Sequence, residues 1–436
     1  MIPPPQRLKE LNRREYEKIL RRSRIKIDEV MKVVIPIIKE VEKEGDKAVL
    51  RWTRKFDKVD LKNEEIFVKE EKIKEAYKRI KPDVLKALRR MEKQLKDFHI
   101  QQKRSDLVSY RSFPNGGEYR LGQKFVPLER VGIYVPGGKG SYPSTVMMGV
   151  VPAKIAGVKK IILASPPSQS GEIADVVMVA ADIAGVDCLI KVGGVQAIAA
   201  LAYGTQSIHG VDLIVGPGNI YVTVAKSYLF GIGKIAIDCP AGPSEILIIA
   251  DESVNSEYIA HDLLSQAEHD ENACAVLVTS SKKIARNVYS CLKEKFHRSL
   301  RKEIIEKSLK NYGAILIVDN LKEAINFANE FAPEHLEIMT EKPEEIFDKI
   351  KNAGSVFLGD FSPVAAGDYL TGTNHILPTG GAAKRFSGLS VDTFLKKLTF
   401  QSLSKKALSS ISKDIITLAS QEGPFEEHIN AIKVRV

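Results

Sequence analysis

The chain lacks the features that would assign it to a membrane or to the extracellular space. No apolar run approaches the roughly 18–20 residues that a membrane-spanning helix needs. Residues 1–7 lack the apolar core of a signal peptide. The four cysteines form no CxxC pair, which fits a reducing compartment and argues against a thiolate zinc finger. We therefore expect a cytoplasmic protein.

Two familiar phosphate-binding signatures are also absent. The glycine turns at 193–196 (Gly-Gly-Val-Gln) and 216–219 (Gly-Pro-Gly-Asn) do not match GxGxxG, and 136–140 lacks the terminal GK[ST] of a phosphate loop. Such turns also serve as plain connections between strands and helices. The spacing leaves nucleotide binding open and identifies no cofactor.

The first 110 residues are rich in basic side chains, but acidic side chains are mixed among them. A net charge of +10 and a pI near 9.1 permit binding to nucleic acid. Acidic residues alternate with the basic ones, however, as at 62–65 and 69–72. Mixed signs are typical of solvated helices with ion pairs one turn apart. We favour a solvated helical surface and keep a nucleic-acid-binding protein as a competing hypothesis.

With 436 residues, of which 44% are hydrophobic, the chain is long enough for two or more domains. Residues 1–110 are predicted to be largely helical, because apolar residues recur on one helix face. Two such sets are Ile27, Val30, Met31 and Val34, and then Val84, Leu85, Leu88 and Met91. Pro36 is expected to kink or restart the first helix, and Pro82 to open the later one.

From Arg130 onward, β-branched runs end in glycine turns and lead into alanine-rich segments, which is typical of an α/β fold. The predicted strands are 131–135, 160–164, 189–192 and 213–215, followed by 246–250, 275–279, 314–318 and 355–358. In a parallel sheet, the glycine turns of the first set lie at the carboxyl ends of the strands, where ligands bind.

The predicted fold class is therefore α/β, with two incomplete Rossmann-like (doubly wound) domains, a helical N-terminal segment and a helical C-terminal tail. The predicted ranges are 1–110 for the N-terminal segment, 120–240 and 241–392 for the two α/β domains, and 393–436 for the tail.

Histidines are concentrated in the second half of the chain. Six of the eight lie beyond residue 260, and four of these sit in short polar motifs. Gln266 and His269 are three residues apart in a predicted helix over 258–271, so they share a face. Asp368 lies in a predicted Gly-rich loop, and His375 follows seven residues later. With His428 these groups suit a mixed nitrogen and oxygen site for zinc or manganese, although helical histidines are often plain surface groups.

Glu334 and His335 form a second candidate pair. They follow Pro333, a residue that often opens a helix, so we predict a helix start whose dipole favours the carboxylate. A carboxylate beside an imidazole can supply two bases for two proton removals. The competing interpretation is a glutamate that only stabilises a helix start.

Cys239 is the only cysteine in an unusual motif, Asp-Cys-Pro-Ala-Gly at 238–242. Buried free cysteines are common and mostly inert. A cysteine-dependent aldehyde dehydrogenase that uses Cys239 is the second enzyme hypothesis.

Taken in order, seven motifs resemble the histidinol dehydrogenase family, and the resemblance covers residues 32–436. They are Arg-Val-Gly-Ile-Tyr-Val-Pro-Gly-Gly (130–138), Gly-Gly-Val-Gln (193–196), Gly-Pro-Gly-Asn (216–219), Pro-Ala-Gly-Pro-Ser-Glu (240–245), Gln-Ala-Glu-His (266–269), Ala-Pro-Glu-His (332–335) and Gly-Asp-Tyr (367–369). So many motifs in one order make coincidence improbable.

The resemblance implies oxidation of L-histidinol through L-histidinaldehyde to L-histidine, with two NAD⁺ and one water, as the last steps of histidine biosynthesis. It implies a homodimer with a shared active site, in which the tail contributes to the dimer and supplies the C-terminal histidine to the partner. The expected zinc ligands are Gln266, His269, Asp368 and His428. NAD contacts in the first α/β domain are expected from Tyr134, Gln196 and Asn219. Substrate contacts are expected from Ser244, His335, His375 and Glu422, together with the four metal ligands.

The resemblance also implies a role for each base. His335 removes the alcohol proton in the first oxidation, and Glu334 activates the water that attacks the aldehyde. Zinc orients the substrate and does not carry the hydride. Many family members read Glu-Gly-Leu-x-x-His near the C-terminus, whereas residues 422–428 here contain one extra residue. Glu426 or Glu427 is therefore an alternative to Glu422 as the substrate contact.

Overall fold

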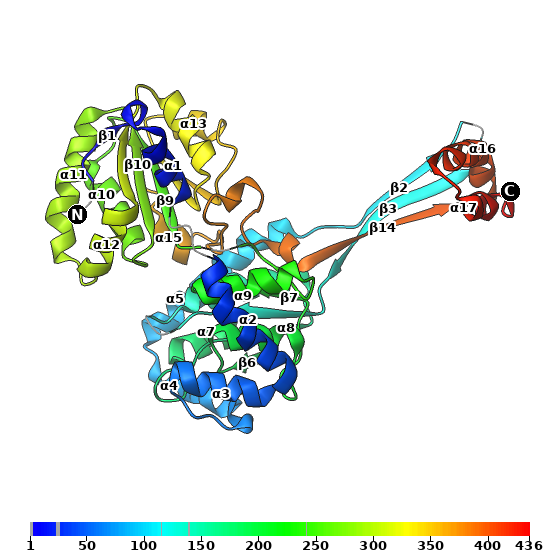
Figure 1. Ribbon diagram of the computed structural model, residues 1–436, viewed down its shortest axis with the longest axis horizontal. Coiled ribbons are helices and arrows are strands. Elements are labelled where there is room, and N and C mark those ends of the chain that lie inside the picture. The colour runs from blue at the N-terminus through cyan, green and yellow to red at the C-terminus, as the bar shows by residue number, and fades with distance from the viewer. Residues whose placement is uncertain (1–2, 23–26, 115, 138–139, 241) are drawn as a thin grey trace.

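Two parallel sheets form the body of the molecule, and a narrow arm projects from it (Figure 1). The computed structural model describes residues 3–22, 27–114, 116–137, 140–240 and 242–436. Within those ranges, no helix is both long and apolar enough to cross a bilayer. Gly138 and Lys139 of the predicted glycine turn and Ala241 of the 240–245 motif lie outside the described residues.

The first sheet has five parallel strands in the order β6-β5-β4-β7-β8. Its strands are β4 (Arg130–Tyr134), β5 (Lys160–Ala164), β6 (Cys188–Ile190), β7 (Leu213–Val215) and β8 (Ala236–Ile237). The helices that connect them are α6 (Pro143–Ala156), α7 (Asp175–Ala184), α8 (Gly194–Tyr203) and α9 (Ile220–Gly231). All four strands predicted for this set are confirmed.

The N-terminal helices form an outer layer on this first sheet. They are α2 (Ile27–Glu44), α3 (Asp46–Asp57), α4 (Glu70–Arg79) and α5 (Pro82–His99). α2 packs on α8 and α9, while α4 and α5 pack on α7 and α6. α6 and α8 are therefore covered on both sides, which explains why they are apolar almost all round. Pro82 opens α5 as predicted, whereas α2 runs through Pro36 without a restart.

The second sheet has six parallel strands in the order β1-β11-β10-β9-β12-β13. They are β1 (Gln6–Arg7), β9 (Glu245–Ala250), β10 (Cys274–Thr279), β11 (Gly313–Ile317), β12 (His335–Met339) and β13 (Ser355–Leu358). One face packs against α10 (Ser256–Ala267), α11 (Lys282–Lys295) and α12 (Lys302–Tyr312). The other packs against α1 (Arg13–Arg21), α13 (Leu321–Phe331) and α14 (Pro343–Phe347).

The arm is a three-stranded antiparallel sheet that carries two helices at its tip (Figure 1). Its elements are β2 (Leu107–Ser112), β3 (Glu118–Pro127), β14 (Leu395–Leu403), α16 (Lys405–Glu422) and α17 (Glu426–Lys433). The expectation that the chain is helical from residue 393 is wrong over β14. That strand forms because it pairs along its whole length with β3.

The predicted fold class is confirmed, since parallel sheets with helices on both faces form both halves of the body. The division of the chain into domains by residue range stays a prediction.

Candidate active site

Glu334 and His335 do not start a helix, so that prediction is wrong. α13 ends at Phe331, and Ala332 takes a left-handed conformation with φ +50°. His335 is then the first residue of β12, and the carbonyl of Glu334 accepts a hydrogen bond from the Ser355 N–H at 2.9 Å. No helix dipole therefore stabilises the Glu334 carboxylate, and its pKa depends mainly on its burial.

His335 is buried, and its contacts show which ring nitrogen carries the proton and which carries the free lone pair. Its Nδ1 lies 3.2 Å from the backbone oxygen of Glu245 and 3.1 Å from Gln266 Oε1. A carbonyl oxygen can only accept, so Nδ1 holds the proton and Nε2 is the acceptor. Nε2 is buried with no hydrogen-bond partner among the described residues. Burial lowers the pKa of His335 to about 4, so the ring is a neutral base at pH 7.

Glu334 lies beside this imidazole, with Oε2 3.7 Å from His335 Nδ1. The same oxygen accepts a hydrogen bond from the Glu245 N–H at 2.8 Å. Burial raises the pKa of Glu334 well above its usual range, although that backbone hydrogen bond opposes the shift. The two groups are thus a buried carboxyl and a buried neutral imidazole, each held by Glu245.

Gln266 and His269 lie at the end of α10, on the same side of the sheet as this pair. The helix ends at Ala267, so the prediction that it continues to residue 271 is wrong. Gln266 is buried, and its Nε2 has no partner in the described part of the chain. His269 Nδ1 donates to the backbone oxygen of Ser265 at 2.8 Å, which leaves Nε2 for a ligand.

Asp368 lies in α15 (Val364–Tyr369) and not in the Gly-rich loop that the sequence predicts. Glu337 of β12 accepts a hydrogen bond from the N–H of Val364 at 2.9 Å, which fixes the start of this short helix. His375 Nδ1 lies 3.2 Å from the backbone oxygen of Asp368, and its Nε2 lies 3.2 Å from Thr145 Oγ1 of α6. His375 therefore links the second half of the body to the first.

The charges of these side chains act on one another. Burial lowers the pKa of His375, and the nearby charge of Asp368 opposes that shift. Asp368 and His269 also affect the pKa of His335, after its burial. The structure thus brings Gln266, His269, Glu334, His335, Asp368 and His375 into one cluster. Ser244 lies next to it, immediately before β9.

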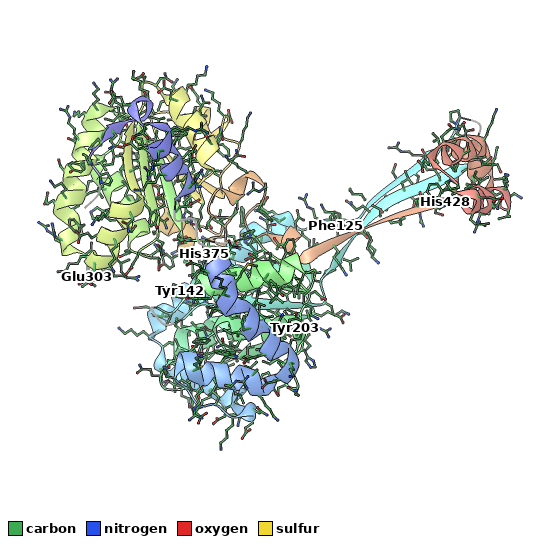
Figure 2. All side chains as sticks on the ribbon, in the orientation of Figure 1. Phe125, Tyr142, Tyr203, Glu303, His375 and His428 are labelled. Carbon is green, nitrogen blue, oxygen red and sulfur yellow. The ribbon has the colours of Figure 1, made fainter. Side chains whose placement is uncertain are left out.

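Glu422 and His428 are not part of this cluster. Glu422 is the last residue of α16, and His428 lies in α17. Figure 2 shows His428 at the far end of the arm and His375 in the body. A single chain therefore does not bring together all the residues predicted for the site.

The three residues predicted to bind NAD lie at the carboxyl edge of the first sheet. Tyr134 ends β4, and its hydroxyl accepts a hydrogen bond from the Gly194 N–H at 3.0 Å. Gln196 in α8 is fully buried, and both of its amide atoms lack partners among the described residues. Asn219 caps α9 by accepting hydrogen bonds from the N–H groups of Tyr221 and Val222. β4 and β7 are neighbours, and the hydrogen bond from Gly194 to Tyr134 brings the turn after β6 to the same edge.

The donor set of the body fits part of a zinc site. Within the described residues no three His, Cys, Asp or Glu side chains gather closely enough to hold a metal ion by themselves. His269 Nε2, the Asp368 carboxylate and the Gln266 amide oxygen are mixed nitrogen and oxygen donors of the kind that zinc accepts. The partnerless Gln266 Nε2 marks the same region as one with unsatisfied polar groups. A fourth donor has to come from outside this part of the chain.

Cys239 does not resemble a nucleophile in this structure. It is 2% exposed, and burial, together with the charge of Asp238, raises the pKa of its thiol. Inert cysteines have this environment, whereas reactive thiols are partly exposed and near positive charge.

The sequence analysis missed two residues behind the candidate pair Glu334 and His335. Glu245 was noted within a motif and given no role, and Arg22 was not noted. Glu245 is 1% exposed, and its side chain pairs with Arg22 at 2.7 Å between Oε2 and Nε. The only signal for Glu245 was its position at the start of an apolar strand, where a charged residue is rarely buried without a partner.

Comparisons with known proteins agree over nearly the whole chain. A family model described as histidinol dehydrogenase matches residues 20–436. The chain is 48% identical over 430 residues to histidinol dehydrogenase of Methanocaldococcus jannaschii, covering 99% of this chain and 98% of that protein. It is 51% identical over 420 residues to the enzyme of the same name from Caldanaerobacter subterraneus, covering 96% of each.

A solved structure shares the fold. The crystal structure of histidinol dehydrogenase from Elizabethkingia anophelis matches with a TM-score of 0.92 at 36% identity, covering 99% of this chain and 97% of that chain. The nucleic-acid and cysteine-enzyme hypotheses find no support in these matches. This chain belongs to the histidinol dehydrogenase family.

Proposed function

We propose that the protein oxidises L-histidinol through L-histidinaldehyde to L-histidine, using two NAD⁺ and one water. The observation that carries the proposal is the buried His335, whose Nε2 has a free lone pair and whose Nδ1 lies 3.7 Å from the Glu334 carboxyl group. Two bases side by side suit a reaction with two successive oxidations. Family membership supports the substrate and the cofactor.

His335 is the base of the first oxidation. Its Nε2 accepts the hydroxyl proton of the alcohol, while Nδ1 stays protonated because carbonyl oxygens face it. The lowered pKa keeps the ring neutral, and thus able to accept a proton, near pH 7. Ser244 and His375 border the same space and are proposed to contact the substrate.

Glu334 is the base of the second oxidation. Water must attack the aldehyde before the second pair of electrons leaves, and a carboxylate can take a proton from that water. The hydrogen bond from the Glu245 N–H holds one oxygen of Glu334 in place and favours the ionised form. Tyr134, Gln196 and Asn219 are proposed to hold NAD⁺, which would supply the hydride acceptor, one NAD⁺ for each of the two oxidations.

Gln266, His269 and Asp368 are the proposed zinc ligands within one chain. When bound, zinc would act as a template that holds the nitrogens of the substrate. The cytoplasmic location expected from the sequence stays a prediction.

The fourth ligand, His428, is proposed to come from the arm of a second copy, so that two chains share each active site. The distance of His428 from the body in Figure 2 supports this arrangement. The arm also exposes large apolar side chains, including Leu107 (61% exposed), Tyr110 (76%) and Leu418 (67%). Such a surface is typical of one that another chain covers. Glu422, at the tip of the same arm, is then carried into the partner's site.

The test is to count the NADH formed per L-histidinol consumed by the purified protein with NAD⁺ and zinc. Two NADH, lost with a chelator and restored by zinc, are expected. One NADH would mean that the aldehyde escapes and that the role given to Glu334 is wrong. No NADH would overturn the proposed substrate.

A further inference from the structure

Arg22 follows α1 and reaches the turn that carries the catalytic pair, although that turn lies more than three hundred residues along the chain. Its side chain is only 4% exposed. The guanidinium group stacks on the ring of Phe331, with 3.4 Å between Cζ and the ring centroid. Nη2 donates hydrogen bonds to the carbonyl oxygens of Phe331 at 2.6 Å and Ala332 at 3.4 Å. Arg22 therefore holds the backbone immediately before Glu334.

The turn that Arg22 holds is strained. Arg22 and Ala332 have φ of +52° and +50°, and only one other non-glycine residue of the described chain, Lys58, has a positive φ. A positive φ is unfavourable for a residue with a side chain, so the surrounding contacts must maintain it. Such residues cluster where function depends on an exact backbone path. Here Ala332 lies two residues before Glu334, and its carbonyl oxygen accepts a hydrogen bond from Arg22.

Arg22 also holds Glu334 from the opposite side, through Glu245. Arg22 Nε lies 2.7 Å from Glu245 Oε2. The other oxygen, Oε1, accepts hydrogen bonds from the N–H groups of Glu334 at 3.1 Å and Gly380 at 3.2 Å. Glu334 Oε2 in turn accepts from the Glu245 N–H at 2.8 Å. The two glutamates thus fix each other's backbone and side chain reciprocally.

This arrangement needs the positive charge of Arg22. A carboxylate as deeply buried as Glu245 is costly unless a cation pairs with it. Burial raises the pKa of Glu245 to about 7, and the charge of Arg22 is the largest of the effects that oppose this rise. Without the guanidinium group, a protonated Glu245 carboxyl would offer poorer acceptors to the Glu334 N–H.

We propose that Arg22 is a positioning residue for Glu334, acting through Glu245 and the Ala332 turn, and that it serves mainly the oxidation of the aldehyde. The inference rests on the proposed function, in which Glu334 activates the water of that step.

The selectivity follows from how the two bases are held. His335 is oriented by the backbone oxygen of Glu245 and by Gln266, neither of which needs the Glu245 side chain. Glu334 depends on Glu245 Oε1, which accepts from its N–H, and on the turn that Arg22 binds. Loss of Arg22 should therefore displace Glu334 more than His335.

The first variant is Arg22→Met, which keeps much of the side chain's length and removes its charge. With L-histidinaldehyde as substrate, kcat should fall about 10- to 100-fold, since small displacements of a catalytic group have effects of this size. Alcohol oxidation, measured with a reagent that traps the aldehyde, should change less than about threefold. KM for L-histidinol and the zinc content should stay as in the parent protein. NADH per histidinol should fall from two toward one.

The matched control is Arg21→Met. Arg21 is the neighbouring residue, its side chain is 60% exposed, and it pairs with Glu17 on the surface. This variant should keep both oxidations. Arg22→Lys retains the charge and should lose a smaller part of the aldehyde step, because a lysine can reach fewer of the carbonyl oxygens.

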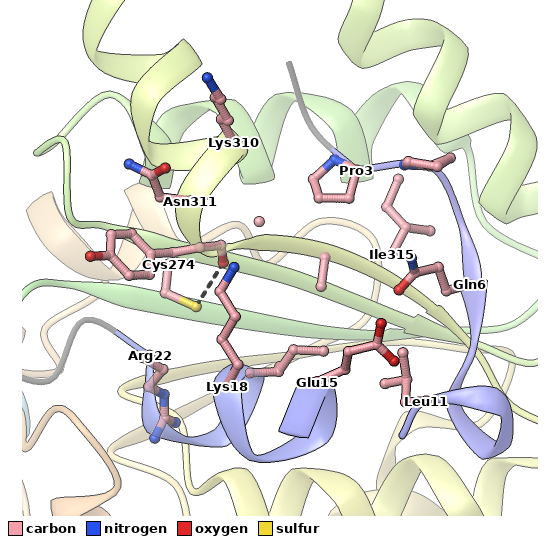
Figure 3. Close-up of a pocket in the computed structure, with 15 residues that line it drawn as sticks. Pro3, Gln6, Leu11, Glu15, Lys18, Arg22, Cys274, Lys310, Asn311 and Ile315 are labelled. Atoms are coloured by element: carbon pink, nitrogen blue, oxygen red, sulfur yellow. Dashed lines mark hydrogen bonds between the residues drawn. The ribbon is translucent and has the colours of Figure 1, made fainter. Parts of the chain in front are cut away.

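Chemical rescue separates positioning from a general loss of structure. A cavity of about 210 Å³ opens beside Arg22, between the N-terminal segment and the starts of β10 and β11 (Figure 3). In Arg22→Ala, guanidinium ion at millimolar concentration, far below denaturing levels, can enter the space that the side chain leaves. It should restore aldehyde oxidation in Arg22→Ala and leave Arg21→Met unchanged.

Equal slowing of both oxidations in Arg22→Met, or behaviour like Arg21→Met, would overturn the proposal. If Arg22→Met does not fold, Arg22→Lys and the rescued Arg22→Ala answer the same question. A parent protein that forms no NADH from L-histidinol would refute the proposed function itself. A parent that forms two NADH, with variants that do the same, would refute only the role of Arg22.

Discussion

The two halves of the body place their candidate groups at opposite edges of similar sheets. The strand order reverses between β4 and β7 in the first sheet and, among the strands from β9 onward, between β9 and β12 in the second. Ligands of such sheets usually bind at the carboxyl ends of these strands. The predicted NAD residues follow that rule, since Tyr134 ends β4 and Asn219 follows β7. Glu245 and His335 instead begin β9 and β12, at the amino ends.

The two edges present different chemical groups, and each has a buried ion pair behind it. In the first half, Lys226 Nζ lies 2.5 Å from Asp238 Oδ1 and donates to the Gly216 carbonyl at 2.8 Å. Asp238 accepts from the Gly216 N–H at 2.8 Å. In the second half, Arg22 and Glu245 hold the turn of Glu334 in the same manner. The Lys226–Asp238 pair supports a glycine turn, which presents backbone groups. The Arg22–Glu245 pair supports the turn of Glu334, which presents side chains.

The largest loss of activity is expected from changes at the arm, because the arm of another chain would complete the zinc site in the second half of the body. His428→Ala and His269→Ala should each lower activity by at least about 10³-fold, since zinc would lose a ligand. Mixing and refolding the two inactive variants together should restore about a quarter of the parent activity, because half of the dimers are mixed and each has one intact site. A mixture that stays inactive, with dimers present, would contradict the shared site.

Substitutions of the two proposed bases, His335 and Glu334, should slow different oxidation steps. His335→Ala should slow alcohol oxidation by about 10²- to 10⁴-fold, the usual contribution of a general base. Glu334→Gln should slow mainly the oxidation of supplied L-histidinaldehyde, by a similar factor. Rapid-quench measurement of each step checks the assignment. Full activity in both variants would remove these residues from the mechanism.

Breaking the ion pair of the first half should change cofactor binding instead. Lys226→Met leaves the Asp238 carboxylate buried without its partner, which should cost about 3–5 kcal/mol in the free energy of unfolding. KM for NAD should rise about tenfold with little change in KM for L-histidinol, because the Gly216 turn loses its support. Lys159→Met, on an exposed lysine, is the control. An unchanged KM for NAD would contradict the idea that the Lys226–Asp238 pair supports its turn as the Arg22–Glu245 pair does.

A third buried group should affect the pH dependence of stability. Burial raises the pKa of Glu337 well above its usual range and that of its neighbour Asp262 to about 6. The folded protein then binds more protons than the unfolded chain above pH ~4, so the stabilising contribution is lost as pH rises toward 6 and beyond. Glu337→Gln keeps an oxygen that can accept the hydrogen bond from the Val364 N–H, and it removes one titratable carboxyl group. Its unfolding free energy should vary less between about pH 4 and 7, by about 1.4 kcal/mol for each pKa unit removed.

Urea unfolding of Glu337→Gln and its parent at several pH values measures that difference. Glu344→Gln, on an exposed glutamate of α14, should follow the parent curve. Parallel curves for the parent and Glu337→Gln would show that this carboxyl group ionises normally.

The smallest effect is expected at Cys239. Because its thiol is buried and its pKa is raised, Cys239→Ser should keep kcat within about twofold in either oxidation. Some loss of stability is compatible with this expectation, since a hydroxyl group would be buried. A loss of aldehyde oxidation alone would revive the thiol mechanism.

The sequence predicted most strands because their residues are apolar on both faces. β12 was missed because His335 and Glu337 interrupt its apolar run, and these polar residues are buried for chemical and structural reasons. β14 was missed because few of its residues are buried and its formation depends on β3, far back in the chain. Local patterns cannot report a strand whose stability comes from a distant partner.

The same limit applies to the site. Motifs singled out the two proposed bases and the proposed ligands in the body, because their residue types are unusual. They did not show that His428 would lie at the end of an arm. Arg22 was missed because it is one arginine in a basic stretch, and its contact with Phe331 spans 309 residues.

The attachment of β1 and Arg22 to the second sheet also sets an order of assembly. β1 pairs with β11, and Arg22 binds the turn after α13, so these residues bind segments that the ribosome makes about three hundred residues later. At roughly 5–20 residues per second this leaves an interval of about 15–60 s. During that time the N-terminal segment has no native sheet to join. The turn before Glu334 is therefore completed only when this earlier-made segment docks onto a part of the chain made much later.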